Sequence, residues 1–131
     1  MIGLDTNILL RFLTQDDQIQ SPIATRILQT ELTEEEPGFV SVVVIVKLAR
    51  VLESRYRQKR ADVVAVIEGL TRINSLRLEH PLAVAAAVTA AVQHNADFTD
   101  ALIGAIGLNT GCRTTLTFDR RAQRLPGFSA A

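Results

Sequence analysis

Acidic residues stand at three separated points of this chain of 131 residues. Asp5 follows an apolar run at the N-terminus, Asp119 follows another near the C-terminus, and Asp97 and Asp100 open an apolar helical pattern between them. Clustered carboxylates are the oxygen ligands that hard divalent cations such as Mg²⁺ or Mn²⁺ prefer. A cation held there binds a phosphate oxygen and lowers the pKa of a bound water. The predicted chemistry is therefore metal-assisted hydrolysis of a phosphodiester.

Each of these acids also has a purely structural interpretation. Asp97, three residues before Asp100, fits a capping box at the start of a helix. Asp119 can likewise cap a last helical turn, and Asp5 with its polar neighbours can form a simple turn. Each of these roles is plausible alone. Their joint occurrence, at points where a phosphate-processing site would form, favours the functional interpretation.

The composition predicts one globular domain over residues 1–131. Apolar residues make up 47% of the chain and charged residues 21%. Because 14 basic residues balance 14 acidic ones, the net charge is zero and gives no indication of a nucleic-acid partner. A single cysteine, Cys112, excludes a disulfide framework and fits a reducing cytosol. The apolar stretch from Leu82 to Val92 is too short to span a bilayer. We therefore expect a cytoplasmic protein with no membrane partner.

The elements that must position the acids follow from hydrophobic periodicity and turn residues. We expect helices after Asp5, from Ser21-Pro22, after a cap at Ser41, from Arg60 to Ile73, from Leu82 to Gln93, and from Asp97 to Gly111. The β-branched run Val42–Val46 is ambiguous, and we assign it to a helix because the apolar spacing beyond it is helical. Short strands are expected at Met1–Leu4, Phe39–Val40, Leu76–Leu78 and Arg113–Phe118, with a final helical turn at Arg120–Leu125.

Short strands that alternate with helices predict an α/β fold, with a short parallel sheet flanked by helices on both faces. In such sheets, sites form at the carboxyl ends of the strands. Asp5 comes after the first expected strand and Asp119 after the last. Both are therefore expected at the same edge of one sheet.

The ordered set of motifs resembles the PIN-domain ribonucleases over nearly the whole chain, and in particular the VapC-type toxins of bacterial toxin–antitoxin modules. The resemblance rests on Leu4–Arg11, Asp97–Ile103 and Thr117–Asp119. It implies a PIN-like three-layer sandwich and Mg²⁺- or Mn²⁺-dependent cleavage of RNA in the cytoplasm. It further implies a homodimer, and inhibition by a VapB-like antitoxin whose segment lies over the active-site groove.

The resemblance also assigns roles to individual residues. Asp5, Asp100 and Asp119 match the family's metal-site acids, and Asp97 matches an acidic neighbour of them. Thr6 and Asn7, in the first motif, and Arg120 and Arg121, beside Asp119, are the candidate substrate-binding residues. Arg113, Arg120, Arg121 and Arg124 flank Asp119 and could hold an RNA backbone by charge.

The chain departs from the family pattern at Lys47, where the family places a Glu. Glu53, six residues further along the helix, points away from the Lys47 face. An opposite-charge pair at about 4 Å in an effective dielectric near 20 is worth about 4 kcal/mol, so an ammonium among the acids would compete with a metal ion. We therefore expect weak metal binding and impaired cleavage. Lys47 is either natural or an inactivating substitution, unless it extends out of the site and has little effect.

Two rival functions remain open from the sequence. A non-catalytic PIN-like domain, acting as an antitoxin-binding module, is favoured by Lys47. A phosphatase with Asp5 as nucleophile is the other. That chemistry commonly places a second acid two residues further on, where this chain has Asn7.

Overall fold

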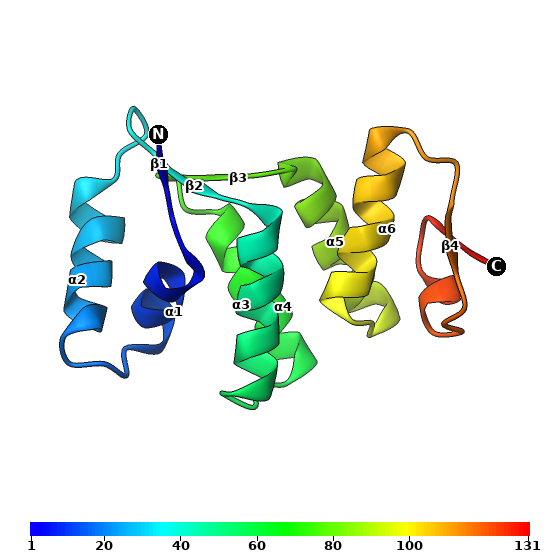
Figure 1. Ribbon diagram of the computed structural model, residues 1–131, viewed down its shortest axis with the longest axis horizontal. Coiled ribbons are helices and arrows are strands. Elements are labelled where there is room, and N and C mark those ends of the chain that lie inside the picture. The colour runs from blue at the N-terminus through cyan, green and yellow to red at the C-terminus, as the bar shows by residue number, and fades with distance from the viewer.

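The computed structural model describes residues 1–131, and its helices outnumber its strands (Figure 1). The strands are β1 (Ile2–Gly3), β2 (Gly38–Val40), β3 (Leu76–Leu78), β4 (Thr115–Thr117) and β5 (Phe128–Ala130). The helices are α1 (Thr6–Thr14), α2 (Gln20–Arg26), α3 (Val42–Ser54), α4 (Arg60–Thr71), α5 (Pro81–His94) and α6 (Phe98–Thr110). A π-helical segment, η1 (Ile27–Glu31), extends α2, and a 3₁₀ turn, η2 (Ala122–Arg124), precedes β5. Every helix is too short or too polar to span a bilayer.

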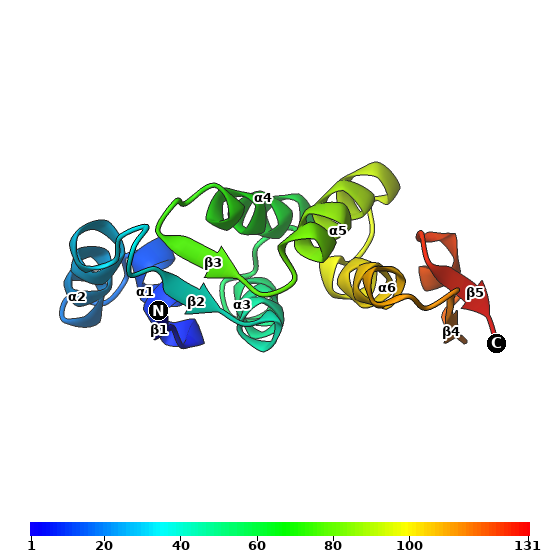
Figure 2. The ribbon, with the colours of Figure 1, turned by 90° about the horizontal axis from the view of Figure 1, so that it is seen from above.

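The predicted α/β class with short parallel strands flanked by helices is confirmed. Strands β1, β2 and β3 pair in parallel in that order. Figure 2 shows α4 on one face of this three-stranded sheet and α3 on the other, which gives a three-layer arrangement. Parallel sheets of this kind are stable because helices cover both of their faces.

The expectation that all strands share one sheet was wrong. Strand β4 pairs only with β5, in a separate two-stranded parallel sheet. Strand β5 was not predicted, because its three residues follow Pro126-Gly127 and carry no distinctive alternation. Figure 1 shows this second sheet at the opposite end of the molecule from β1, beyond α5 and α6.

Local capping signals explain where most helices begin and end. The Ser41 hydroxyl accepts a hydrogen bond from the Val44 N–H at 3.2 Å, and α3 starts directly after it, as predicted. Gly111 ends α6 with a φ of 104°, a conformation that favours glycine. The helix expected from Ser21-Pro22 begins one residue earlier, at Gln20, and its N-cap Ile19 makes no side-chain capping bond. The Asp17 Oδ1 accepts the N–H groups of Ile19 and Gln20 at the start of this helix.

The three-stranded sheet packs tightly against its helices. A core cluster of 25 buried residues runs from Leu4 through α3, α4 and α5 to Phe98 and Leu125. Gly38 in β2 is enclosed by the side chains of Leu4, Leu32 and Leu76, so that an added Cβ would lie 2.8 Å from the nearest of them. The central strand therefore has no room for a side chain at this position.

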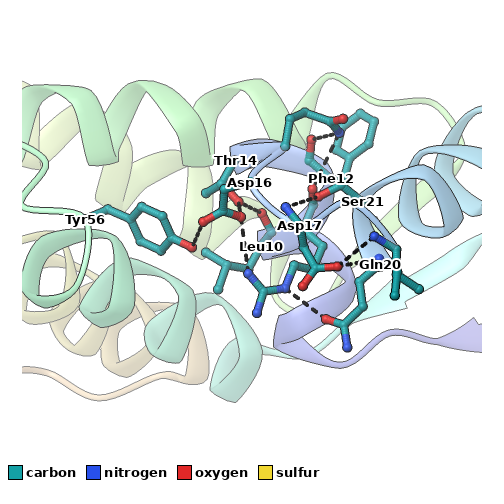
Figure 3. Close-up of polar contacts among 11 residues, drawn as sticks. Leu10, Phe12, Thr14, Asp16, Asp17, Gln20, Ser21 and Tyr56 are labelled. Carbon is teal, nitrogen blue, oxygen red and sulfur yellow. Dashed lines mark hydrogen bonds and ion pairs between the residues drawn. The ribbon is translucent and has the colours of Figure 1, made fainter.

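A polar cluster joins the α1–α2 connection to the end of α3. Asp16 accepts hydrogen bonds at 2.6 Å from the hydroxyls of both Thr14 and Tyr56 (Figure 3). Arg11 pairs with the same carboxylate at 3.2 Å. The Thr14 and Tyr56 hydroxyl bonds lower the pKa of Asp16 from 3.8 to about 2. The charged form of Asp16 is therefore favoured, and it links the α1–α2 connection to Tyr56 at the end of α3.

Candidate active site

A cavity of about 630 Å³ lies where the first turns of α4 and α6 meet the turn that follows β4. Asp97, Asp100 and Asp119 all line it. We call this cavity the aspartate pocket; its charged and polar lining also includes Arg60, Arg121, Arg124, His94 and Asn95. Three of the four predicted metal-site acids therefore share one pocket.

Backbone hydrogen bonds fix two of these aspartates. Asp97 is the N-cap of α6, and its Oδ1 accepts the Asp100 N–H at 3.1 Å, as the capping interpretation predicted. This cap directs the first turn of α6, and Asp100 with it, toward the pocket. The Asp119 Oδ1 accepts the Arg121 N–H at 2.8 Å, and the Asp119 N–H donates to the Thr117 hydroxyl at 3.0 Å. A structural cap and a functional carboxylate are thus compatible at both positions.

The environment of Asp100 disfavours its charged form. Burial raises the pKa of Asp100 above its ordinary value of 3.8, and the nearby charges of Asp97 and Asp119 raise it further. Arg50 and Arg60 act in the opposite direction. No ion pair within 4 Å involves any of these three aspartates. Unpaired carboxylates with a perturbed pKa in a cleft are a common property of functional sites.

Two residues that were not predicted at the site, Glu53 and Arg50, also lie close enough to affect its charges. Burial, and next the charge of Asp97, raises the pKa of Glu53, whereas Arg60 and Arg50 lower it. Glu53 and Arg50 lie on α3, which packs against α6. Six residues along α3 separate Glu53 from Lys47 in angle, but this spacing does not determine how close Glu53 lies to another helix. Because α3 and α6 are far apart in sequence, no local spacing signals their contact.

Lys47 does not pair with the acids within one chain. Its side chain is exposed, and it takes part in none of the ion pairs within 4 Å. The predicted competition between Lys47 and a metal ion therefore has no counterpart in the single-chain arrangement.

The first motif lies apart from the aspartate pocket. Asp5 is exposed at the N-cap of α1, and its side chain makes no capping hydrogen bond. Thr6 is only 2% exposed, and its hydroxyl has no hydrogen-bond partner. Asn7 lines a different groove of about 200 Å³, between α1 and α2. Of the two predicted arginines, Arg121 lines the aspartate pocket, and Arg120 is exposed and not part of its lining.

The predicted metal ligands are not gathered into one three-ligand cluster within the chain. Nowhere in the structure do three His, Cys, Asp or Glu side chains come close enough together to hold an ion. Asp5, the ligand missing from the aspartate pocket, follows β1, whereas the pocket lies against α6 and the turn after β4. Because the two sheets are separate, the predicted ligands are divided between them: Asp5 lies beside the first sheet, and the three aspartates of the pocket lie beside α6 and the second sheet.

Parallel strands flanked by helices, together with carboxylates and arginines around one pocket, are typical of proteins that act on phosphate esters. Comparison with family models gives a match to the PIN domain over residues 2–127. The chain therefore belongs to the PIN domain family, whose members are generally nucleases. No curated protein matches the chain.

Proposed function

We propose that this protein is an endoribonuclease toxin of a toxin–antitoxin module, in which Mg²⁺ or Mn²⁺ assists hydrolysis of RNA phosphodiester bonds. The observation that carries the proposal is the gathering of Asp97, Asp100 and Asp119 around one pocket, in a chain of the PIN domain family. Nuclease activity is the coarse property of that family. RNA as substrate, the metal ion and the role as toxin are our extension of it.

The charges around the aspartate pocket support a polyanionic substrate. Arg60, Arg121 and Arg124 line the pocket together with the three aspartates. Arginines bind phosphate oxygens through planar, bidentate hydrogen bonds. Two aromatic residues adjoin the pocket lining in sequence: Phe98, next to Asp97, is buried, whereas Phe118, next to Asp119, is 91% exposed and is available to stack on one base. Because aromatic residues make up only 5% of the chain, recognition rests mainly on the RNA backbone and its shape.

We further propose that Lys47 impairs cleavage in this chain. It occupies the position at which the family places a Glu, so the chain lacks that carboxylate and carries an ammonium in its place, although the exposed Lys47 pairs with none of the acids within one chain. Exchange of −1 for +1 changes the charge at that position by two units. In the proposed module, a VapB-like antitoxin covers the site of the active toxin.

The test is RNA cleavage with Mg²⁺ or Mn²⁺, comparing the chain with its Lys47→Glu and Lys47→Gln variants. We expect Lys47→Glu to cleave at least about 100-fold faster than the chain with Lys47, because loss of one electrostatic stabiliser typically costs that much. Lys47→Gln serves as the control that removes the positive charge without supplying a ligand. Asp100→Asn in the Lys47→Glu background should abolish the gain.

One alternative function has specific support. The lack of a three-ligand metal cluster within one chain, together with Lys47, favours a non-catalytic PIN-like domain that acts only as an antitoxin-binding module. Absence of cleavage by Lys47→Glu, with either metal and with structured and single-stranded RNAs, would contradict the nuclease proposal and support this alternative.

A further inference from the structure

One aromatic side chain differs from the others in its exposure. Phe118 is 91% exposed, more than any other large apolar side chain of this protein. The other four phenylalanines are buried or half-buried. Phe118 directly follows β4, and Figure 2 shows β4 and β5 at one end of the molecule, beyond α6. Its ring therefore contributes little to the core and is accessible to a ligand.

Hydrogen bonds on both sides hold the backbone that carries this ring. Before it, the Thr117 C=O accepts the Ala131 N–H at 3.0 Å. After it, the Asp119 N–H donates to the Thr117 hydroxyl at 3.0 Å, and the Asp119 C=O accepts the Gln123 N–H at 3.2 Å. An aromatic side chain has only two rotatable bonds, so a ring on a fixed backbone loses little conformational entropy when it binds. The turn after β4 thus presents Phe118 in a defined place.

Phe118 is also adjacent to the aspartate pocket. Asp119, the next residue, lines the pocket together with Asp97 and Asp100. Because consecutive Cα atoms are about 3.8 Å apart, Phe118 lies at the rim of the pocket. Phe118 itself does not line the pocket. A ligand can therefore contact the aspartates and the ring at the same time.

The charges beside the ring indicate an anionic ligand. Arg120, Arg121 and Arg124 follow Phe118 within six residues, and all three are exposed. None of them pairs with an acid within 4 Å. An exposed ring among unpaired cations is the arrangement by which proteins bind single strands of nucleic acid, since the cations follow the phosphates and the ring stacks on a base.

A protein partner fits this surface less well. The centre of a protein interface is depleted of charged residues and packs its aromatic anchors into apolar pockets. Along this segment only Leu116, 66% exposed, adds apolar surface, and the residues after Phe118 are Asp119, Arg120 and Arg121. A nucleobase needs only one flat apolar face with charges beside it.

We propose that Phe118 is a stacking platform for an unpaired nucleobase, and that it selects the nucleotide whose phosphate occupies the aspartate pocket. A base inside a duplex is covered by its neighbours, so only an unpaired base reaches the ring. Stacking tolerates every base, and the larger face of a purine favours purines. The base contact stands by itself, and only the selection of the cleaved nucleotide rests on the proposed function.

The first test uses the absence of tryptophan from this chain. In Phe118→Trp, the only indole stands at the proposed platform, and a base stacked on it quenches its fluorescence. The probes are an adenine RNA decamer and an abasic ribose-phosphate decamer, both titrated in EDTA so that no metal-assisted cleavage occurs. The control is Leu82→Trp. Leu82 is 74% exposed near the start of α5, twelve residues before the pocket residue His94, and thus about 18 Å from it along the helix.

We expect the adenine strand to quench the fluorescence of Phe118→Trp and to leave that of Leu82→Trp unchanged. The abasic strand should quench neither variant. Equal quenching by both strands, or no quenching of Phe118→Trp by the adenine strand, would overturn the proposal.

The affinity for RNA gives a second measurement, by fluorescence anisotropy of a labelled adenine decamer in EDTA. Phe118→Ala should raise the Kd about 5- to 150-fold, the range expected for the loss of one stacked base, and Phe118→Tyr should keep it. Leu116→Ala is the matched control, because it removes a neighbouring exposed apolar side chain and should leave the Kd unchanged. Equal Kd values for the parent and Phe118→Ala would overturn the proposal and favour a protein partner for the ring.

Salt dependence separates stacking from charge. Phe118→Ala should leave the slope of log Kd against log salt concentration unchanged, because a ring releases no counterions. Arg124→Gln should reduce that slope by about 0.7, the value for one phosphate of a single strand. A reduced slope in Phe118→Ala would overturn the stacking role.

Cleavage is measured separately, in the Lys47→Glu background with Mg²⁺ or Mn²⁺. We expect Phe118→Ala in that background to lose the preference for adenine over uracil at the cleaved nucleotide. Quenching and a Phe118-dependent Kd without any cleavage would refute only the nuclease. Cleavage whose rate and position are the same with and without the ring would refute only the selection by Phe118.

Discussion

The two parallel sheets of this protein differ in what holds them. The three-stranded sheet lies between helices, and its central strand β2 is enclosed on both faces. The β4–β5 sheet has no fully buried residue in either strand, and isolated two-stranded sheets are marginal in water. It depends on α6, through the contact of Gly104 with Phe128 and Pro126. The C-terminal unit is thus a folded extension, without a core of its own.

The same difference appears in the charges of the two regions. In the N-terminal part, hydroxyl bonds from Thr14 and Tyr56 hold the pKa of Asp16 at about 2. In the aspartate pocket, burial and the neighbouring aspartates raise the pKa of Asp100. One acid is satisfied by its surroundings and stabilises the fold. The other is held at a cost, which is usual where a site is built for a ligand.

The largest effect is expected at the link between α6 and the second sheet. In Gly104→Ala, the added Cβ would lie 2.6 Å from the Phe128 ring and 2.8 Å from the Pro126 carbonyl oxygen. Since the backbone oxygen cannot rotate away, we expect a loss of about 1–3 kcal/mol in the free energy of unfolding, measured by urea denaturation. Hydrogen exchange should show the loss first in β4 and β5.

The matched control for that variant is Gly69→Ala in α4, where an added Cβ meets no atom within 4 Å. It should stabilise the chain by roughly 0.5–1 kcal/mol through helix propensity. Equal effects of the two substitutions would contradict the dependence of the second sheet on α6.

A smaller effect, of opposite sign, is expected at Asp100. Because its folded pKa is raised, the folded state carries no penalty below pH 3.8, and it loses stability as the pH rises from 3.8 through the folded pKa. Asp100→Asn removes this loss, so the variant should be more stable than the parent at pH 7 and nearly equal to it at pH 3.5. Urea midpoints at the two pH values measure the difference. A variant less stable at pH 7 would show that the charge of Asp100 is satisfied.

The smallest effect is expected at the Asp16 cluster. A lowered folded pKa contributes stability that is present above pH 3.8 and is lost as the pH falls toward about 2. Tyr56→Phe removes one of the two hydroxyl donors, so we expect lower stability at pH 7 and a smaller further loss between pH 4 and pH 2. Melting temperatures of the variant and the parent, measured at several pH values between 4 and 2, test this expectation.

Ser54→Ala is the control for Tyr56→Phe, because the Ser54 hydroxyl donates to the backbone carbonyl of Arg50 and to no titrating group. Its effect should be independent of pH. If both variants change stability by the same amount at pH 7 and pH 2, the Asp16 pKa is not set by these hydroxyls.

Much of the local structure could be predicted from the sequence, because it depends on interactions over a few residues. Ser41 before α3, Asp97 before α6 and Gly111 after α6 act on the backbone next to them, and the structure confirms all three. The helical spacing of the α3 residues also outweighed the β-branched run at its start. The ordered acidic motifs predicted the family to which the chain belongs.

Tertiary structure alone decided which distant segments meet. Strands of two or three residues carry too little alternation to specify their partners, so the sequence could not show that β4 pairs with β5 and not with β1. For the same reason it predicted one edge for Asp5 and Asp119, whereas a single chain holds them in separate sheets. The approach of Glu53 and Arg50 to the aspartates depends on the packing of α3 against α6, and no local pattern encodes that contact.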